Sequence, residues 1–218
     1  MIDFLFNNAS RILGLTGEHL FIVGLSLAIA LATGVPLGIL ITRHQRLAQK
    51  VIGAANVIMT VPSIALFGLM LPVLAIFGHG LGKVPAVIAL VLYSQLPIIR
   101  NTYIAIRQVD PAIVDAARGM GLSKWQRLRE VEIPLAIPII LAGVRTAAVM
   151  NIGIAAIAAY VGAGGLGVLI QQGIARTYPE MILAGALVVS LLAVVVDLLL
   201  AWTERALTPR GLTQARGQ

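Results

Sequence analysis

The sequence predicts an all-α membrane protein with five transmembrane helices. Of its 218 residues, 59% are hydrophobic and 11% are charged, whereas roughly a quarter of a soluble domain is charged. Five apolar stretches reach the ~20 residues that a helix needs to cross the hydrocarbon core. They are too long and too uniformly apolar for the alternating strands of a membrane barrel. The chain has no cysteine, which excludes disulfides, thiolate metal sites and cysteine nucleophiles.

The five predicted spans are separated by segments that carry most of the charged residues. The spans are residues 20–42, 51–77, 84–106, 135–160 and 181–203. They divide the chain into an external N-terminal segment at 1–19, a transmembrane domain at 20–203 and a cytoplasmic tail at 204–218. Residues 1–19 lack the basic start and short apolar core of a signal peptide, so we expect no cleavage there.

The basic residues predict the orientation of the chain, because cytoplasmic segments next to spans carry an excess of lysine and arginine. Such residues follow the first, third and fifth spans, where they are Arg43, Arg46, Lys50, Arg107, Arg118, Lys124, Arg127, Arg129, Arg205, Arg210 and Arg216. On the opposite side lie Arg11, Lys83 and Arg176. We therefore expect the N-terminus outside and the C-terminus in the cytoplasm. The net charge of +7 then needs no nucleic-acid partner to explain it.

The polar segment between the third and fourth spans predicts a folded loop and not a flexible tether. Asp110 followed by Pro111 is typical of a helix start, with an oxygen acceptor at the cap and proline at the first helical position. This helix should end near residue 120, where Gly121 can adopt the left-handed conformation. Ser123 and Gln126 have the spacing of a capping box that starts a second short helix.

The first of these helices should present a small-residue face to a partner. Ile113, Ala116 and Ala117 fall on one face at helical spacing, where the alanines leave room for another backbone to approach. A polar rim and a large aromatic anchor would come from Asp115, Arg118 and Trp125. The alternative is an amphipathic loop that lies on the membrane surface without a partner.

The same segment carries a family motif. Asp115-Ala116-Ala117 is followed after three residues by Gly121, and after nine more by the run VEIP, which ends at Pro134. This spacing resembles the coupling loop of ATP-binding-cassette (ABC) importer permeases, whose pattern is Glu-Ala-Ala, three residues, Gly, nine residues and Ile-x-Leu-Pro. The resemblance covers nearly the whole chain and implies the type I importer permease fold, with residues 107–134 as the cytoplasmic coupling loop.

The resemblance also implies partners. The coupling residues Asp115, Ala116, Ala117, Arg118, Gly121, Trp125 and Pro134 would dock on a cytoplasmic ABC ATPase subunit, which would hold ATP and Mg. This chain has no phosphate-binding loop, since Gly82-Lys83 is followed by Val84, so we expect neither enzymatic activity nor a cofactor on it. A second permease subunit, identical or paralogous, and an extracytoplasmic substrate-binding protein would complete a multi-pass assembly among the lipids of the bacterial inner membrane.

Proline and glycine recur inside the spans, and two interpretations remain open. Small residues allow helices to pack closely in membranes. Alternatively, kinks at Pro62 and Pro97 shape a pathway that opens alternately to each side. The candidate pathway residues are Pro62, Ser63, Tyr93, Pro97 and Tyr160.

Arg145 and Asp197 are ionisable residues within the fourth and fifth spans, where they should pair or face water. A mutual pair, a structural charge at a subunit interface and a role in transport all remain open. His19, His44 and His79 lie at different helix ends, which favours interfacial positions and not a metal site.

A glycine-rich run at residues 160–167 reads YVGAGGLG. Its last six residues match a dinucleotide-binding pattern, but they follow a membrane helix and not a strand, which favours a flexible or close-packed external loop. This run, residues 60–63 (TVPS) and the Asp110-Pro111 pair are similar to the glycine betaine, carnitine and choline permeases of the family. We therefore expect an osmoprotectant as cargo. The alternatives are methionine or another small solute, an ion-coupled secondary transporter, or a structural membrane scaffold.

Overall fold

The computed structural model describes residues 2–207, and within this range all regular structure is helical. The chain begins with α1 (Ile2–Asn7) and α2 (Ala9–Ile41), followed by α3 (Gln45–Thr60), α4 (Ser63–Ala75) and α5 (Lys83–Arg107). A short helix, α6 (Pro111–Gly119), precedes α7 (Lys124–Arg127), a π-helical turn (Leu128–Glu132) and α8 (Ile133–Ile157). A 3-10 turn (Ala158–Val161), α9 (Gly167–Ala175) and α10 (Pro179–Leu207) complete the fold.

Four continuous helical segments are long and apolar enough to cross a membrane, and they confirm four of the predicted spans. They are α2, α5, the continuous helix 124–161 and α10. The first of them starts at Ala9, well before the predicted start at residue 20. Of the predicted tail at 204–218, residues 208–218 lie outside the described range.

The predicted span at residues 51–77 is interrupted in the structure, at the proline where a kink was one of the two interpretations. α3 and α4 meet at a bend of 99°, so together they form either a broken span or a re-entrant segment. Pro62 lies at the break, and Val61 before it has an extended backbone (φ −70°, ψ 127°). Proline disfavours the α conformation in the residue that precedes it, which ends α3 here.

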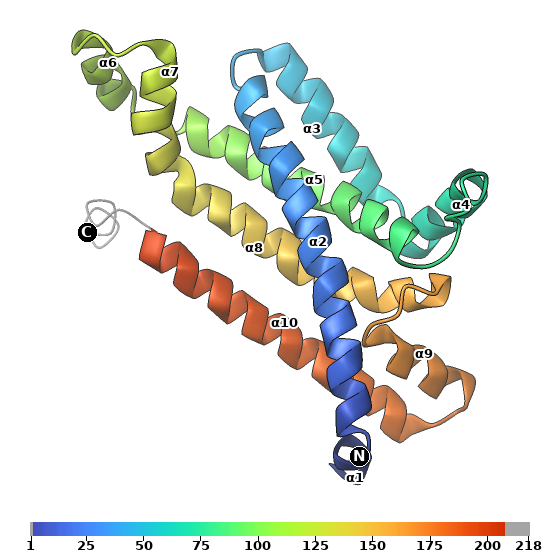
Figure 1. The fold of residues 1–218 in the computed structure, drawn as a ribbon. Helices are drawn as coiled ribbons and strands as arrows, with labels where there is room; N and C mark the ends of the chain where they lie inside the picture. Colours follow the sequence, from blue (N-terminus) through green and yellow to red (C-terminus); the bar gives the residue numbers. More distant parts are fainter. Residues whose placement is uncertain (1, 208–218) are drawn as a thin grey trace.

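α5 is the centre of the bundle and packs against α2, α8 and α3, while α10 packs against α8 and α9. Figure 1 shows α2 crossing α5 and α8, with α10 running beside α8 on the other side. Glycines bring the backbones together: a methyl group on Gly38 would lie 2.6 Å from Cβ of Thr102, and one on Gly143 would lie 2.7 Å from the carbonyl oxygen of Pro97. The glycines at these two contacts serve close packing, as in other membrane helices.

Candidate functional site

The loop between α5 and α8 has the local geometry that its sequence predicts. Asp110 caps α6, since its carboxylate accepts a hydrogen bond from the backbone N–H of Ala112 at 2.8 Å, and Pro111 is the first helical residue. Gly121 ends the helix with φ +80°. The Ser123 hydroxyl accepts from the N–H of Gln126 at 3.3 Å, and the Gln126 side chain accepts from the N–H of Ser123 at 2.9 Å. The predicted capping box is therefore confirmed.

The exposed face of α6 differs from the predicted one. Ala117 is only 1% exposed, because α6 turns this side toward α7 and the π-helical turn. Asp115, Ala116 and Arg118 are exposed, and Trp125 is 64% exposed at the start of α7. The exposed surface of the loop is therefore built from Ala116 and its polar neighbours, while Ala117 serves the packing of the loop itself.

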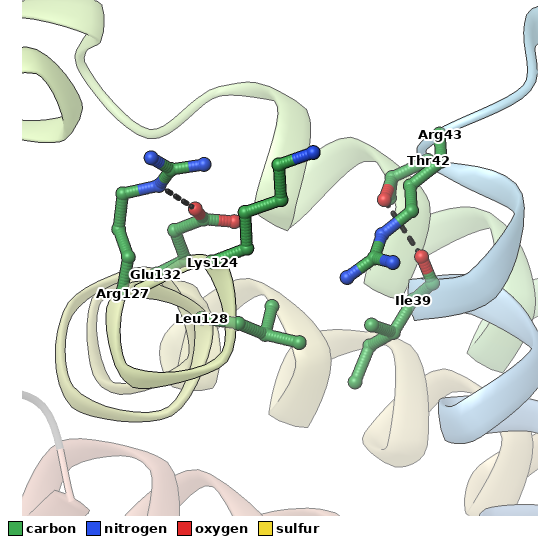
Figure 2. Close-up of a pocket in the computed structure, with 7 residues that line it drawn as sticks. All are labelled: Ile39, Thr42, Arg43, Lys124, Arg127, Leu128 and Glu132. Atoms are coloured by element: carbon green, nitrogen blue, oxygen red, sulfur yellow. Dashed lines mark hydrogen bonds and ion pairs between the residues drawn. The ribbon is translucent and has the colours of Figure 1, made fainter. Parts of the chain in front are cut away.

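The loop is continuous with the helix that follows it. α7, the π-helical turn and α8 form one helical segment, so the second short helix is the first turn of a long one. Pro134, expected at the end of the loop, lies in the first turn of α8 inside this segment. Arg127 donates to Glu132 at 3.0 Å across the π-helical turn (Figure 2). A movement of the loop would therefore reach α8 without a flexible joint.

Three of the predicted pathway residues lie together at the break between α3 and α4. Tyr93 on α5 is 3% exposed, and its hydroxyl donates to the carbonyl oxygen of Val61 at 2.5 Å. Pro62 and Ser63 follow directly, with Ser63 as the first residue of α4. The hydrogen bond gives a donor to the carbonyl of Val61, the cap residue after α3, which the break in the helix leaves without an intrahelical partner.

The other two pathway candidates lie elsewhere. α5 continues through Pro97, which is buried where Gly143 of α8 approaches. This placement favours close packing over an open pathway at Pro97. Tyr160, in the 3-10 turn, is 49% exposed at the far end of α8.

Arg145 and Asp197 form the mutual pair that the sequence left open. Two nitrogens of the Arg145 guanidinium donate to the two carboxylate oxygens of Asp197, one of them at 2.7 Å, and a third lies 3.9 Å from Glu204. The pair joins α8 to α10. Its side chains are 37% and 31% exposed toward an open groove of about 560 Å³, whose α8 wall includes Thr146 and Val149.

The glycine run at residues 160–167 is a close-packed loop. Gly164 and Gly165 both have positive φ, and the N–H of Gly165 donates to the carboxylate of Glu18 at 3.0 Å. A methyl group on Gly167 would lie 1.9 Å from the carbonyl oxygen of Ala156, so only glycine fits there. Of the two expectations for this run, the structure supports close packing over flexibility.

His19 was expected at a helix end, and this expectation was wrong because α2 starts at Ala9 and includes it. His19 is 0% exposed. One ring nitrogen accepts from the N–H of Leu166 at 3.3 Å and the other lies 3.1 Å from the carbonyl oxygen of Ile152. With Glu18, it joins α2 to the glycine run and to α8. The signal for this contact was the run itself, whose positive-φ glycines turn backbone N–H groups toward a neighbour.

Residues 2–207 contain no group of three or more metal-ligating side chains that could hold a metal ion. The candidate site has three parts. They are the folded loop between α5 and α8, the bend between α3 and α4 with the buried Tyr93, and the Arg145–Asp197 pair.

Comparison with known proteins places these features in a family. Residues 34–209 match the family described as "Binding-protein-dependent transport system inner membrane component". The chain is 52% identical over 211 residues to the osmoprotectant import permease protein OsmW of Salmonella typhimurium, covering 97% of this chain and 98% of that protein. It is 44% identical over 212 residues to the glycine betaine/carnitine/choline transport system permease protein OpuCB of Bacillus subtilis, covering 97% and 95%.

Solved structures share the fold. The inward-facing MetNI methionine ABC transporter includes a chain that is 24% identical, with a TM-score of 0.82 and coverage of 96% of this chain and 100% of that one. A crystal structure of an amino acid ABC transporter gives 22% identity and a TM-score of 0.76, with coverage of 93% and 96%.

Proposed function

The chain belongs to the family of binding-protein-dependent transport system inner membrane components, and from this we propose that it is the permease subunit of an ATP-driven importer for osmoprotectants such as glycine betaine, choline or carnitine. The observation that carries the proposal is high identity over almost the full length to permeases named for these solutes. The likeness to methionine and amino acid transporters rests on the fold alone. An ion-coupled carrier needs an intramembrane site for its ion, and the engagement of Asp197 by Arg145 does not favour that alternative.

We infer a topology of five crossings, in which α3 and α4 together form one broken span. With the basic residues on the cytoplasmic side, the N-terminus lies outside and the C-terminus inside. Residues 1–19 then begin on the external side, residues 20–203 hold the transmembrane domain and residues 204–218 form a cytoplasmic tail. This arrangement places the α5–α8 loop in the cytoplasm and the glycine run outside.

The cytoplasmic loop would dock on an ABC ATPase subunit, which holds ATP and Mg. Asp115, Ala116, Arg118 and Trp125 are exposed and available for that contact. Ala117, Gly121 and Pro134 would act by shaping the loop. Because α7 is continuous with α8, displacement of the docked loop would be transmitted to the span that carries Arg145.

The remaining surface would meet lipid, a second permease subunit and an extracytoplasmic binding protein. α10 exposes a long apolar face that suits lipid or another permease, made up of Leu183, Leu187, Leu191, Val194, Val195, Leu198 and Leu199. The bend at Pro62 and the groove beside Arg145 are the parts of the fold that best suit a pathway between two permease subunits, with Ser63, Tyr93, Pro97 and Tyr160 as pathway or supporting residues.

Uptake into proteoliposomes tests this proposal. The chain would be reconstituted with its ATPase and binding protein, with ATP inside the vesicles or absent. We expect ATP-dependent uptake of glycine betaine, choline or carnitine. Uptake of methionine alone would overturn the substrate assignment, and uptake that needs no ATP would overturn the importer mechanism.

Two variants of the chain test the docking surface. Ala116→Leu adds bulk on the exposed face of α6 and should abolish both ATPase copurification and uptake while the chain still inserts. Ala175→Leu makes the same change at an exposed position on the external side and should leave ATPase copurification intact. Equal copurification of the two variants would contradict a docking role for α6.

A further inference from the structure

We propose that the junction between α2 and the coupling loop is a binding site for a phosphate group, carried by an anionic lipid or by a soluble phosphate compound. A cavity of about 390 Å³ lies there, between the end of α2 and the segment formed by α7 and the π-helical turn (Figure 2). Its volume falls in the range of small-ligand sites. None of its lining residues belongs to the docking surface described above.

The lining carries an excess of positive charge. Arg43 lies in the turn that follows α2, and Lys124 and Arg127 come from α7. Glu132 is the one acidic lining residue, and it is bonded to Arg127 at 3.0 Å. Arg43 and Lys124 form no ion pair with a carboxylate of residues 2–207. Two cations on facing segments are therefore left to bind an anion.

The floor of the cavity is apolar. Ile39 and Leu128 extend from the two sides below the charged groups (Figure 2). A cationic rim above an apolar floor suits a phosphate head with apolar material beneath it. In the topology proposed above, Arg43 directly follows the cytoplasmic end of the first span, which is the depth of the lipid headgroups. An occupant would bridge α2 and the coupling segment and so stabilise their present arrangement.

The choice of phosphate follows from the geometry of the donors. Arginine presents a planar fork of N–H groups and lysine a compact ammonium, and both form charge-assisted hydrogen bonds with phosphate oxygens. A carboxylate of the ATPase subunit has a similar charge and is the competing occupant. The experiment below distinguishes a phosphate occupant from a carboxylate of the ATPase.

Tryptophan fluorescence provides a local readout, because Trp125 adjoins Lys124 and the chain has only one other tryptophan, Trp202. In a Trp202→Phe background, the full chain would be placed in nanodiscs of phosphatidylcholine. One arm titrates inorganic pyrophosphate, and the other raises the phosphatidylglycerol content of the discs. A saturable change in Trp125 emission in either arm is the expected result, and the arm in which it occurs identifies the source of the phosphate.

Charge variants decide whether binding in the cavity causes the change in Trp125 emission. Arg43→Gln with Lys124→Gln should weaken the response about tenfold or more, as expected for losing charge-assisted hydrogen bonds. Arg46→Gln with Lys50→Gln removes the same charge from exposed positions on α3 outside the cavity and should leave the response unchanged. Glu132→Gln should strengthen binding, because it frees Arg127 for the ligand.

Three results would overturn the site. They are the absence of a saturable response in both arms, equal losses in the two double variants, and a loss of ATPase copurification in Arg43→Gln with Lys124→Gln that Arg46→Gln with Lys50→Gln does not show. The last would assign the cavity to a protein contact. Because the measurement is binding to the purified chain, a negative result would leave the transport proposal untouched.

Discussion

Gly121 offers a sharp test of how the loop between α5 and α8 is held together. The residue has φ +80°, and a methyl group added to it would meet no atom within 4 Å. Its N–H donates to the carbonyl oxygen of Arg118 at 3.0 Å, and the N–H of Leu122 donates to that of Ala117 at 3.2 Å. These two bonds form the Schellman ending of a helix, which requires the left-handed conformation at this residue. Any loss of loop stability in Gly121→Ala would therefore come from the backbone conformation and not from a steric clash.

The backbone conformation of Gly121 sets the expected size of this destabilisation. An L-residue in the left-handed conformation costs about 1–2 kcal/mol, which corresponds to a factor of roughly 5–30 in an equilibrium constant. Gly119 provides the matched control, since it lies two residues earlier, inside α6, also with no atom within 4 Å of an added methyl group. Gly119→Ala should stabilise the helix by about 0.5–1 kcal/mol.

Hydrogen exchange of the loop amides measures both effects. We expect the N–H groups of Gly121 and Leu122 to exchange roughly 5–30 times faster in Gly121→Ala and more slowly in Gly119→Ala. Gly121→Asn should fall between Gly121→Ala and the wild type, because asparagine tolerates the left-handed region. Equal exchange rates in the two alanine variants would refute the claim that backbone conformation at Gly121 holds the loop.

Three further predictions concern the spans and the glycine run. Gly167→Ala should destabilise the chain by about 3 kcal/mol or more, because the new methyl group meets the backbone of Ala156, whereas Gly153→Ala, which meets nothing within 4 Å, should leave the melting temperature in detergent nearly unchanged. Tyr93→Phe should cost about 1 kcal/mol by leaving the Val61 carbonyl without its donor, and an unchanged melting temperature would show that the bond does not support the bend. Asp197→Asn should lower the melting temperature more than the double change of Asp197→Asn with Arg145→Gln. The single change leaves the Arg145 charge with only the more distant Glu204, at 3.9 Å, as a partner, and the opposite order would mean that Arg145 and Asp197 are not coupled.

Local features of this protein could be predicted from the sequence because they depend on residues a few positions apart. The caps at Asp110 and Ser123 and the helix stop at Gly121 are each set by side chains within one turn. The apolar spans depend on length and composition, which are likewise local. The coupling motif is a matter of spacing along the chain.

Side-chain burial could not be predicted in the same way. Ala116 and Ala117 look alike in sequence, and only the approach of α6 to α7 decides that one is exposed and the other buried. His19 is buried because α2 begins early enough to carry it against the glycine run. The bend at Pro62 was expected as a kink, but its angle of 99° depends on the way α4 packs.

The sequence by itself determined that the chain is helical, lies in a membrane and folds its polar loop into capped helices, since these depend on composition and short-range hydrogen bonds. Its resemblance to importer permeases was also visible there, in the spacing of one motif. The tertiary structure alone decided that Arg145 pairs with Asp197, 52 residues away, and that Arg43 faces Lys124 across a cavity. Contacts of this kind join helices that are distant along the chain, and their geometry exists only after the helices have packed.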